Sequence, residues 1–432
     1  MVIIEKVQST IISLAALGIF FSSPVEAKIE SLNSLIRLAQ SKDHRAAAAL
    51  SHEQAVENGI SMESSKYLPS LQLEMIDSEG FPGSSSELNM HGLVASPYRE
   101  GAGVDLILSQ TLWDFGRTSN SVEAAKNKLE AQKATTKELS NRIARETTDA
   151  YFRCVSAKTS IEYWKQIATH AKVISEEVNK FVKTGQKSVV EKYLSKSQFD
   201  EYERKKEDAE NAYQYSMKYL QQVTLTVNES LDCPVLKDLN WNAITIDESP
   251  KLNLTYQRME AEKNTSGSLM KRAKADYYPK LLGMGSVGVL EGERLVDKKD
   301  YALGIALSFP IFEGGVTQAK VHQAENSRIQ KETELLAEAD EIGKMNLIFN
   351  EKIEKERNRI KLLTVETTEA QTAFELAQSR YMKLEGSLVD LRESLKFVLA
   401  TRLEYTEARV NFLRHNAEKA IFNGQLEKLD RY

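Results

Sequence analysis

The chemically active side chains of this chain are scattered rather than grouped. Charged residues make up 28% of its 432 residues, but no spacing among them assembles a catalytic triad. There is no glycine-rich phosphate loop and no Cys or His cluster at metal-ligand spacing, and the six histidines, among them His44, His52 and His91, are dispersed. The sequence therefore predicts no enzyme, no cofactor and no metal. The formal net charge of −5 also gives no indication of the basic surface that nucleic-acid-binding proteins carry.

Two cysteines, Cys154 and Cys233, remain as candidates for covalent chemistry. An oxidising compartment would permit a disulfide, but two widely spaced cysteines do not make a disulfide framework. Because Cys154 falls inside one predicted long helix and Cys233 at the end of another, we expect two free thiols.

The first residues indicate export. Lys6 precedes an apolar run that reaches Phe21, and residues 25–27 form a Val-x-Ala cleavage signal. The alternative is a buried N-terminal helix, but the pattern favours a signal peptide over residues 1–27. No other apolar run approaches the roughly 20 residues of a membrane-spanning helix. We therefore expect an exported chain in which any membrane crossing is made by strands.

Four strand-like segments occur in two pairs, which indicates an internal duplication. The segments are Leu68–Ile76 with Gly103–Asp114, and Leu281–Val289 with Tyr301–Phe312. Each pair is preceded by a Tyr-x-Pro motif, at Tyr67-Leu68-Pro69 and at Tyr277-Tyr278-Pro279. Each is followed by an aromatic and glycine motif, at Trp113-Asp114-Phe115-Gly116 and at Phe312-Glu313-Gly314-Gly315.

Long helices must connect these strand pairs. No proline occurs from Tyr98 to Cys233 or from Ile311 to Tyr432, and both stretches are rich in good helix formers. Each stretch contains a run of about 70 residues, or roughly 105 Å of helix. Apolar residues recur in alternating steps of three and four, which is typical of a coiled coil. Breaks at Thr184-Gly185 and Glu385-Gly386 predict one helical hairpin in each half.

The strand segments alternate large apolar residues with small or polar ones. In the last segment Tyr301, Leu303 and Ile305 alternate with Ala302 and Gly304. This pattern and a length of about 9–11 residues suit a membrane β-barrel with a wet lumen, although alternation alone fits a soluble half-buried sheet equally well. Four strands cannot close a barrel, and an open edge is costly in lipid, so we expect several copies to pool their strands.

In the order and spacing of these motifs the chain resembles the TolC family of outer-membrane export ducts over almost all of its mature length. The resemblance implies a mainly α fold with a membrane β-barrel contribution. In a homotrimer, four strands per protomer would be pooled into a 12-stranded barrel that continues into a long α-helical coiled-coil periplasmic trunk. It implies a location in the outer membrane of a Gram-negative bacterium, in contact with outer-membrane lipid. The implied partners are a periplasmic adaptor and an inner-membrane ABC or proton-driven pump.

The resemblance also assigns candidate site residues. Counted from Arg380-Tyr381, Asp390 and Glu393 take the positions of an acidic pair that lines the periplasmic gate, although a carboxylate on such a helix is usually only solvated. The family's turn glycine aligns with Leu384, whereas this chain has Gly386 two residues later. The implied adaptor-facing tips are Lys183, Gly185, Gln186, Glu385 and Gly386. The motifs before and after the barrel strands are marked by Pro69, Pro279, Trp113, Gly116, Phe312, Gly314 and Gly315.

The expected organisation follows the duplication. After the signal peptide (1–27) come an N-terminal helical segment (28–66), the first strand pair with an exposed loop (67–113) and the first helical hairpin (114–231, turn near 184–186). An equatorial mixed segment (232–263) and a helix (264–276) lead to the second strand pair (277–312). The second hairpin (313–423, turn near 384–387) and a C-terminal tail (424–432) complete the chain.

The sequence therefore favours an exit duct for small-molecule efflux or for type I secretion of an unfolded protein. The stretch Gln110–Gly116 resembles members that serve type I secretion of large adhesins. The alternative is a non-conducting coiled-coil spacer or adhesin stalk. A stalk has no need of four alternating segments of membrane length, so the strand pairs favour the duct.

Overall fold

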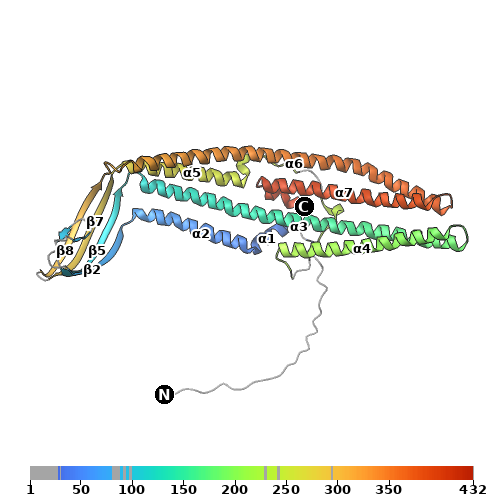
Figure 1. Ribbon diagram of the computed structural model, residues 1–432, viewed down its shortest axis with the longest axis horizontal. Coiled ribbons are helices and arrows are strands. Elements are labelled where there is room, and N and C mark those ends of the chain that lie inside the picture. Colours follow the sequence, from blue (N-terminus) through green and yellow to red (C-terminus); the bar gives the residue numbers. More distant parts are fainter. Residues whose placement is uncertain are drawn as a thin grey trace, which may run out of the picture.

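The computed structural model describes residues 28–29, 31–79, 88–90, 94–96, 100–227, 231–240, 244–292 and 295–431. The predicted signal peptide and parts of the loops between paired strands lie outside these residues. The chain is elongated, with a β-sheet at one end and two helical hairpin turns at the other (Figure 1). Among the described helices, none has an apolar stretch long enough to cross a membrane.

The helices occur in two sets of matching length, which confirms the predicted internal duplication. Helices α2 (His44–Ser64) and α5 (Leu254–Lys274) have 21 residues each. Helices α3 (Arg117–Lys183) and α6 (Val316–Met382) have 67 residues each. Helices α4 (Val189–Val223) and α7 (Leu388–Phe422) have 35 residues each. A short helix, α1 (Leu32–Lys42), precedes α2.

The shorter helices begin at side-chain caps that the sequence supplies. Ser31 accepts a hydrogen bond from the Ser34 N–H at the start of α1. Asp43 and Asn253 cap α2 and α5 in the same way. A side-chain oxygen at this position satisfies backbone N–H groups that have no partner inside the helix.

A four-stranded antiparallel sheet lies at one end, in the order β2-β5-β7-β8. Its strands are β2 (Ser70–Glu79), β5 (Glu100–Trp113), β7 (Lys280–Gly292) and β8 (Leu295–Ser308). Two short strands, β3 (Leu88–Met90) and β4 (Val94–Ser96), lie in the chain segment that connects β2 to β5 and pair with each other in a separate two-stranded sheet. Large apolar side chains are exposed on this sheet, including Leu71, Leu73, Met75, Val104, Leu303, Ile305 and Leu307.

The last strand is shorter than predicted. Strand β8 ends at Ser308, whereas the alternation predicted a strand that continues to Phe312. In the first half, β5 continues to Trp113 because Trp113 pairs with Leu281 of β7. Strand β8 is an edge strand, so in the single chain no second neighbour pairs with its last residues.

The expectation of two free thiols is wrong, because Cys154 and Cys233 form a disulfide with a Cα–Cα distance of 6.1 Å. After α4 the chain returns across α3 through the short strand β6 (Leu231–Asp232), which brings the two cysteines together. Lys158 Nζ lies 2.6 Å from Asp232 Oδ2 beside this bond. The position of Cys154 inside a helix carried no information about which later segment would cross it.

Two buried clusters lie along the helices. One, near the middle of the molecule, joins α1, α3 and the end of α7 through residues such as Leu32, Phe152 and Phe412. The other lies towards the hairpin turns and joins α3, α6 and α7 through residues such as Ile174, Phe374 and Leu391. Each cluster contains residues of both hairpins, so the two hairpins form one packed unit.

Candidate functional site

The predicted site residues lie at the two opposite ends of the helices (Figure 1). One group lies where the strands join α3 and α6, and the other lies at the two hairpin turns. The 67-residue helices between these ends correspond to roughly 100 Å. No single pocket can contain both groups, so each end is described separately.

The first hairpin turn has a standard helix ending. Gly185 takes a left-handed conformation with φ of 74°. The Gly185 N–H donates to the Val182 carbonyl at 3.1 Å, and the Gln186 N–H donates to the Phe181 carbonyl at 2.8 Å. These two bonds form a Schellman motif, in which glycine is favoured because it lacks a Cβ. Lys183, Gly185 and Gln186 are all exposed at this turn.

The second hairpin turn builds the same motif without glycine at the left-handed position. Leu384 has φ of 65°, and the Glu385 N–H donates to the Arg380 carbonyl at 3.0 Å. Gly386 serves another purpose, since a Cβ there would lie 2.9 Å from the Tyr381 nitrogen. The displaced glycine noted in the sequence thus allows the chain to pass close to the end of α6.

The two turns are bonded to each other. Lys187 Nζ donates to the Gly386 carbonyl at 3.2 Å and lies 4.8 Å from the centre of the Tyr381 ring. The buried Tyr381 hydroxyl donates to Glu191 Oε2 at 2.6 Å. Burial and this bond to Glu191 raise the pKa of Tyr381, so the hydroxyl stays protonated and able to donate. These contacts hold the start of α4 against the end of α6.

The predicted gate carboxylates, Asp390 and Glu393, are exposed on the first turns of α7. Asp390 lies in the first turn, where the helix dipole favours a negative charge. Glu393 Oε1 lies 3.0 Å from Lys396 Nζ on the same helix. Between them Arg392 Nε donates to Gln198 of α4 at 3.0 Å. Arg392 therefore connects α7 to the first hairpin, whereas both carboxylates are accessible to solvent.

At the other end, two glycines begin the long helices. Gly116 has φ of 91° and precedes α3, and Gly315 has φ of 85° and precedes α6. Asp114 Oδ2 accepts a hydrogen bond from the Thr118 N–H at 2.8 Å. In the second half, Gly314 also has a positive φ and Glu313 accepts from the Thr317 hydroxyl.

The remaining predicted motif residues surround these junctions. Pro69 and Pro279 lie immediately before β2 and β7. The Trp113 ring packs edge-on against Phe115 with the centroids 6.0 Å apart. Phe312, its counterpart in the second half, is 88% exposed.

Sequence reasoning missed the side chains that join the two halves of the chain. The most important are Glu191 and Lys187 at the turns, and Arg117 at the sheet end, which forms an ion pair with Asp276 at 2.6 Å. One available signal was position within the repeat. Asp114 and Glu313 each stand four residues before a threonine, a repeated spacing that could have indicated matching contacts at the starts of the two long helices.

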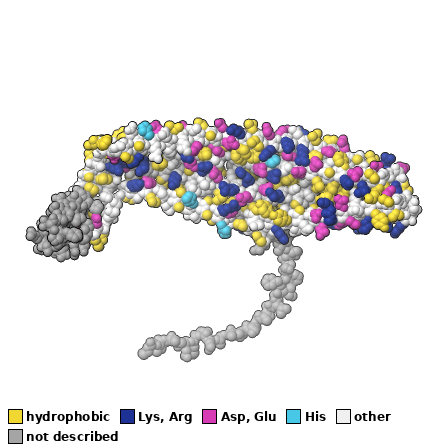
Figure 2. Space-filling model, viewed as in Figure 1, with side chains coloured by type: hydrophobic (Ala, Val, Ile, Leu, Met, Phe, Trp, Pro, Cys, Tyr) yellow, Lys and Arg dark blue, Asp and Glu magenta, His cyan; other side chains and the backbone are white. Residues whose placement is uncertain are grey.

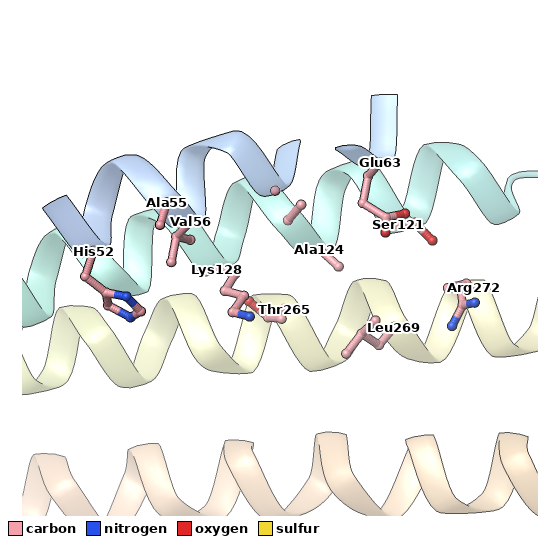
Figure 3. Close-up of a pocket in the computed structure, with 12 residues that line it drawn as sticks. His52, Ala55, Val56, Glu63, Ser121, Ala124, Lys128, Thr265, Leu269 and Arg272 are labelled. Atoms are coloured by element: carbon pink, nitrogen blue, oxygen red, sulfur yellow. The ribbon is translucent and has the colours of Figure 1, made fainter. Parts of the chain in front are cut away.

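A groove of about 520 Å³ runs between α2 and α5 over α3. Figure 3 shows its lining, with His52 and Glu63 on α2, Lys128 on α3 and Arg272 on α5. Within the described part of the chain, no group of three or more Cys, His, Asp or Glu side chains could hold a metal ion. Basic and acidic side chains are interspersed over the helical face seen in Figure 2.

The chain matches no protein-family model and none of the curated proteins. Its fold, however, is shared with solved bacterial outer-membrane channels. CusC, which forms a transmembrane channel, has a TM-score of 0.78 and 13% identity over 92% of both chains. The outer-membrane protein VceC of Vibrio cholerae has a TM-score of 0.71 and 15% identity, covering 91% of this chain and 96% of VceC. The open state of the MtrE channel of Neisseria gonorrhoeae has a TM-score of 0.74 and 16% identity, covering 92% of this chain and 89% of MtrE. The expected mainly α fold, with four strands at one end and long helical hairpins, is therefore confirmed.

Proposed function

We propose that this chain is the outer-membrane exit duct of a tripartite export system in a Gram-negative bacterium. The observation that carries the proposal is the fold shared with outer-membrane channels over more than nine-tenths of the chain. The four-stranded sheet adds support, because its exposed apolar side chains have the arrangement that a lipid-facing surface requires. The chain acts as a conduit and catalyses no reaction.

In this proposal three copies pool their strands into one closed wall, since each sheet has two unpaired edges at β2 and β8. An unpaired edge in lipid costs several kcal/mol for each unsatisfied backbone group, so closure between copies is strongly favoured. The helices then line a periplasmic trunk that ends at the hairpin turns.

The narrow end of the duct is assigned to the turn region. Asp390 and Glu393 from three copies would form a ring of carboxylates that attracts cations and repels itself. The bonds from Glu191 to Tyr381 and from Lys187 to Gly386 hold the two hairpins together in the same region. Opening would therefore require both the carboxylate ring to widen and the hairpins to move.

The exposed turns, with Lys183, Gly185, Gln186, Glu385 and Gly386, are the surface we assign to a periplasmic adaptor. Energy would come from an inner-membrane ABC or proton-driven pump, since nothing in the described chain resembles a nucleotide site. The cargo is either a small molecule in efflux or an unfolded protein in type I secretion. Cargo choice would be made mainly by the pump.

The test is single-channel current through the purified protein in a planar bilayer. The wild type should give discrete, cation-preferring conductance. The double variant Asp390→Ala/Glu393→Ala should give a larger or less cation-selective current, because the ring loses its charge. A matched control is Glu404→Ala/Glu407→Ala, which removes two exposed carboxylates with the same spacing on the same helix.

Each outcome discriminates. Equal changes in both double variants would remove the gate assignment, since any loss of charge on α7 would then have the same effect. Unchanged current in the Asp390/Glu393 variant would leave the duct and also remove the gate. No current from folded wild-type protein would favour a non-conducting spacer or adhesin stalk.

A further inference from the structure

The groove between α2 and α5 has the size and the lining of a small-molecule site. Its volume of about 520 Å³ lies within the roughly 300–1,000 Å³ that is usual for ligand pockets. Its lining is mostly small or apolar, with Ala55 from α2, Ala124 from α3 and Leu269 from α5. It extends along α2 from His52 to Glu63, which corresponds to roughly 16 Å of helix. This shape suits a single alkyl chain.

The groove is open because α2 covers α3 only loosely. Helix α2, which is described throughout, buries none of its residues, whereas its counterpart α5 buries Ala261, Ser266 and Ser268. Gly59 lines the groove from α2, and a Cβ added there would meet no atom within 4 Å. A bound molecule therefore has room beside this position.

Two cations in the lining have no partner of their own. Within the described part of the chain, neither the Lys128 nor the Arg272 side chain forms an ion pair or a hydrogen bond. Glu63, the carboxylate in the lining, lies 2.7 Å from Lys66 Nζ and is neutralised there. Figure 3 shows Lys128 lying between His52 and Arg272 along the groove. The groove therefore carries positive charge that no carboxylate of its lining balances.

Farther from the sheet, the basic side chains between these helices are paired. Arg258 of α5 lies 3.2 Å from Glu138 of α3 and 2.7 Å from Glu262 of its own helix. Lys331 of α6 lies 3.0 Å from the same Glu262. These pairs join α3, α5 and α6, so their cations contribute to helix packing. The two groove cations form no such pair among the described residues and are available to an anion.

The groove lies on the concave face of the helical layer. On α3, Ser121 and Ala124 at the floor of the groove are buried. Glu123, Lys126 and Glu130, on the opposite side of the same helix, are exposed. Since α2 and α5 both pack against α3, burial on one side only means that both lean over the groove. When such layers close into the proposed duct, the concave face becomes its interior.

We propose that this groove binds a single-chain anionic amphiphile. Its charged head pairs with Lys128 or Arg272, since an anion accepts charge-assisted hydrogen bonds from either side chain. Its alkyl chain lies on the apolar stretch between them, where Figure 3 shows Ala124 and Leu269. Burial of the chain is favourable because it removes apolar surface from water. The binding needs residues of one chain only, and its place inside the duct rests on the proposed function.

Binding can be measured with a fluorophore placed in the groove. Gly59→Cys supplies a thiol at the open position, and both native cysteines are at most 1% exposed and joined to each other, so a maleimide dye labels the new thiol alone. The probe is octanesulfonate, added to labelled protein in lipid nanodiscs, and the dye emission should change and saturate. Gly343→Cys in α6 is the matched control, since it also has no atom within 4 Å, and it should show no saturable change.

The cations are tested by single variants in the labelled Gly59→Cys background. Lys128→Gln or Arg272→Gln, whichever removes the partner of the head, should weaken binding about tenfold or more. The controls are Lys126→Gln and Lys271→Gln, which remove exposed cations from the same two helices outside the lining and should leave the affinity unchanged. If neither groove variant weakens binding more than its control does, the proposal is wrong.

Three further probes test the class of ligand. Ethanesulfonate has the same head without the long chain, octyl glucoside has the chain with a neutral head, and octyltrimethylammonium has the chain with a positive head. Each should bind at least about tenfold more weakly than octanesulfonate. Equal binding of ethanesulfonate would indicate a simple anion site, and equal binding of either of the other two would indicate an apolar groove without charge selection. Any of these results overturns the proposal.

Single-channel current separates this proposal from the proposed function. Octanesulfonate should interrupt the wild-type current, and the groove variant that weakens binding should shorten the interruptions. Saturable binding to a protein that carries no current supports the groove and overturns the duct. Current without saturable binding overturns the groove and leaves the duct intact. Saturable binding with a current that octanesulfonate never interrupts overturns the position of the groove inside the duct.

Discussion

Removal of the disulfide between Cys154 and Cys233 should produce a large loss of stability. The bond joins residues 79 positions apart. In the chain-entropy description, closing a loop of that size in the unfolded state corresponds to about 4.5 kcal/mol, and typical measured values are about 2–4 kcal/mol. Both cysteines are at most 1% exposed. Alanine is therefore the better replacement, because a serine hydroxyl would be buried at each position.

The measurement is urea unfolding of detergent-solubilised protein, followed by the helical circular dichroism signal. Cys154→Ala, Cys233→Ala and the double variant all lack the same bond, so all three should lose nearly the same free energy of unfolding. Cys154→Ala with reductant serves as a control, since reductant has no native bond left to break in it. Additive losses in the two single variants would refute the reasoning, because they would arise from packing at each site rather than from the cross-link.

Two further predictions concern the hairpin turn and acid stability. Gly386→Ala should lower the free energy of unfolding by about 1–3 kcal/mol, because the new Cβ would lie 2.9 Å from a backbone atom. The control is Gly343→Ala in α6, where the new Cβ meets nothing within 4 Å. This control should raise the free energy of unfolding by up to about 1 kcal/mol, because alanine is the better helix former. Thermal unfolding of both variants checks this, and a loss of equal size at Gly343 would contradict it. Burial raises the pKa of Asp232, but hydrogen bonds from Lys158 and Tyr213 outweigh it and lower that pKa from its ordinary 3.8. The ionised Asp232 therefore stabilises the fold above about pH 4. This stabilisation is lost as the pH falls below that value through the folded-state pKa. The urea midpoint of wild type should therefore fall more steeply with acid than that of Asp232→Asn, and parallel curves would count against this account.

The parts of the fold that could be predicted are those written in local patterns. Proline-free runs with alternating steps of three and four predicted the long helices, and Thr184-Gly185 and Glu385-Gly386 predicted where they turn back. Alternation predicted four strands in two pairs. The exception is the end of the last strand, which was predicted to reach Phe312 but ends at Ser308. Phe312 has the same place in its motif as Trp113, but β8 is an edge strand and has no second neighbouring strand in a single chain.

The candidate site was predicted only in part. The turn residues could be found from the breaks in periodicity, but the sequence did not reveal that Leu384 adopts the left-handed conformation while Gly386 provides room for close contact. Which of the two residues takes which role depends on the atoms around each of them, and for Gly386 those atoms belong to the last turn of α6.

By itself the sequence determined the repeat, the long helices and the alternation of the strands, because each can be recognised from the order and spacing of residue types along the chain. Only the tertiary structure decided which distant side chains meet. The pairs Cys154–Cys233, Glu191–Tyr381 and Arg117–Asp276 are separated by 79, 190 and 159 residues respectively. Their partners are selected by how the hairpins and strands pack, and no local spacing encodes that packing.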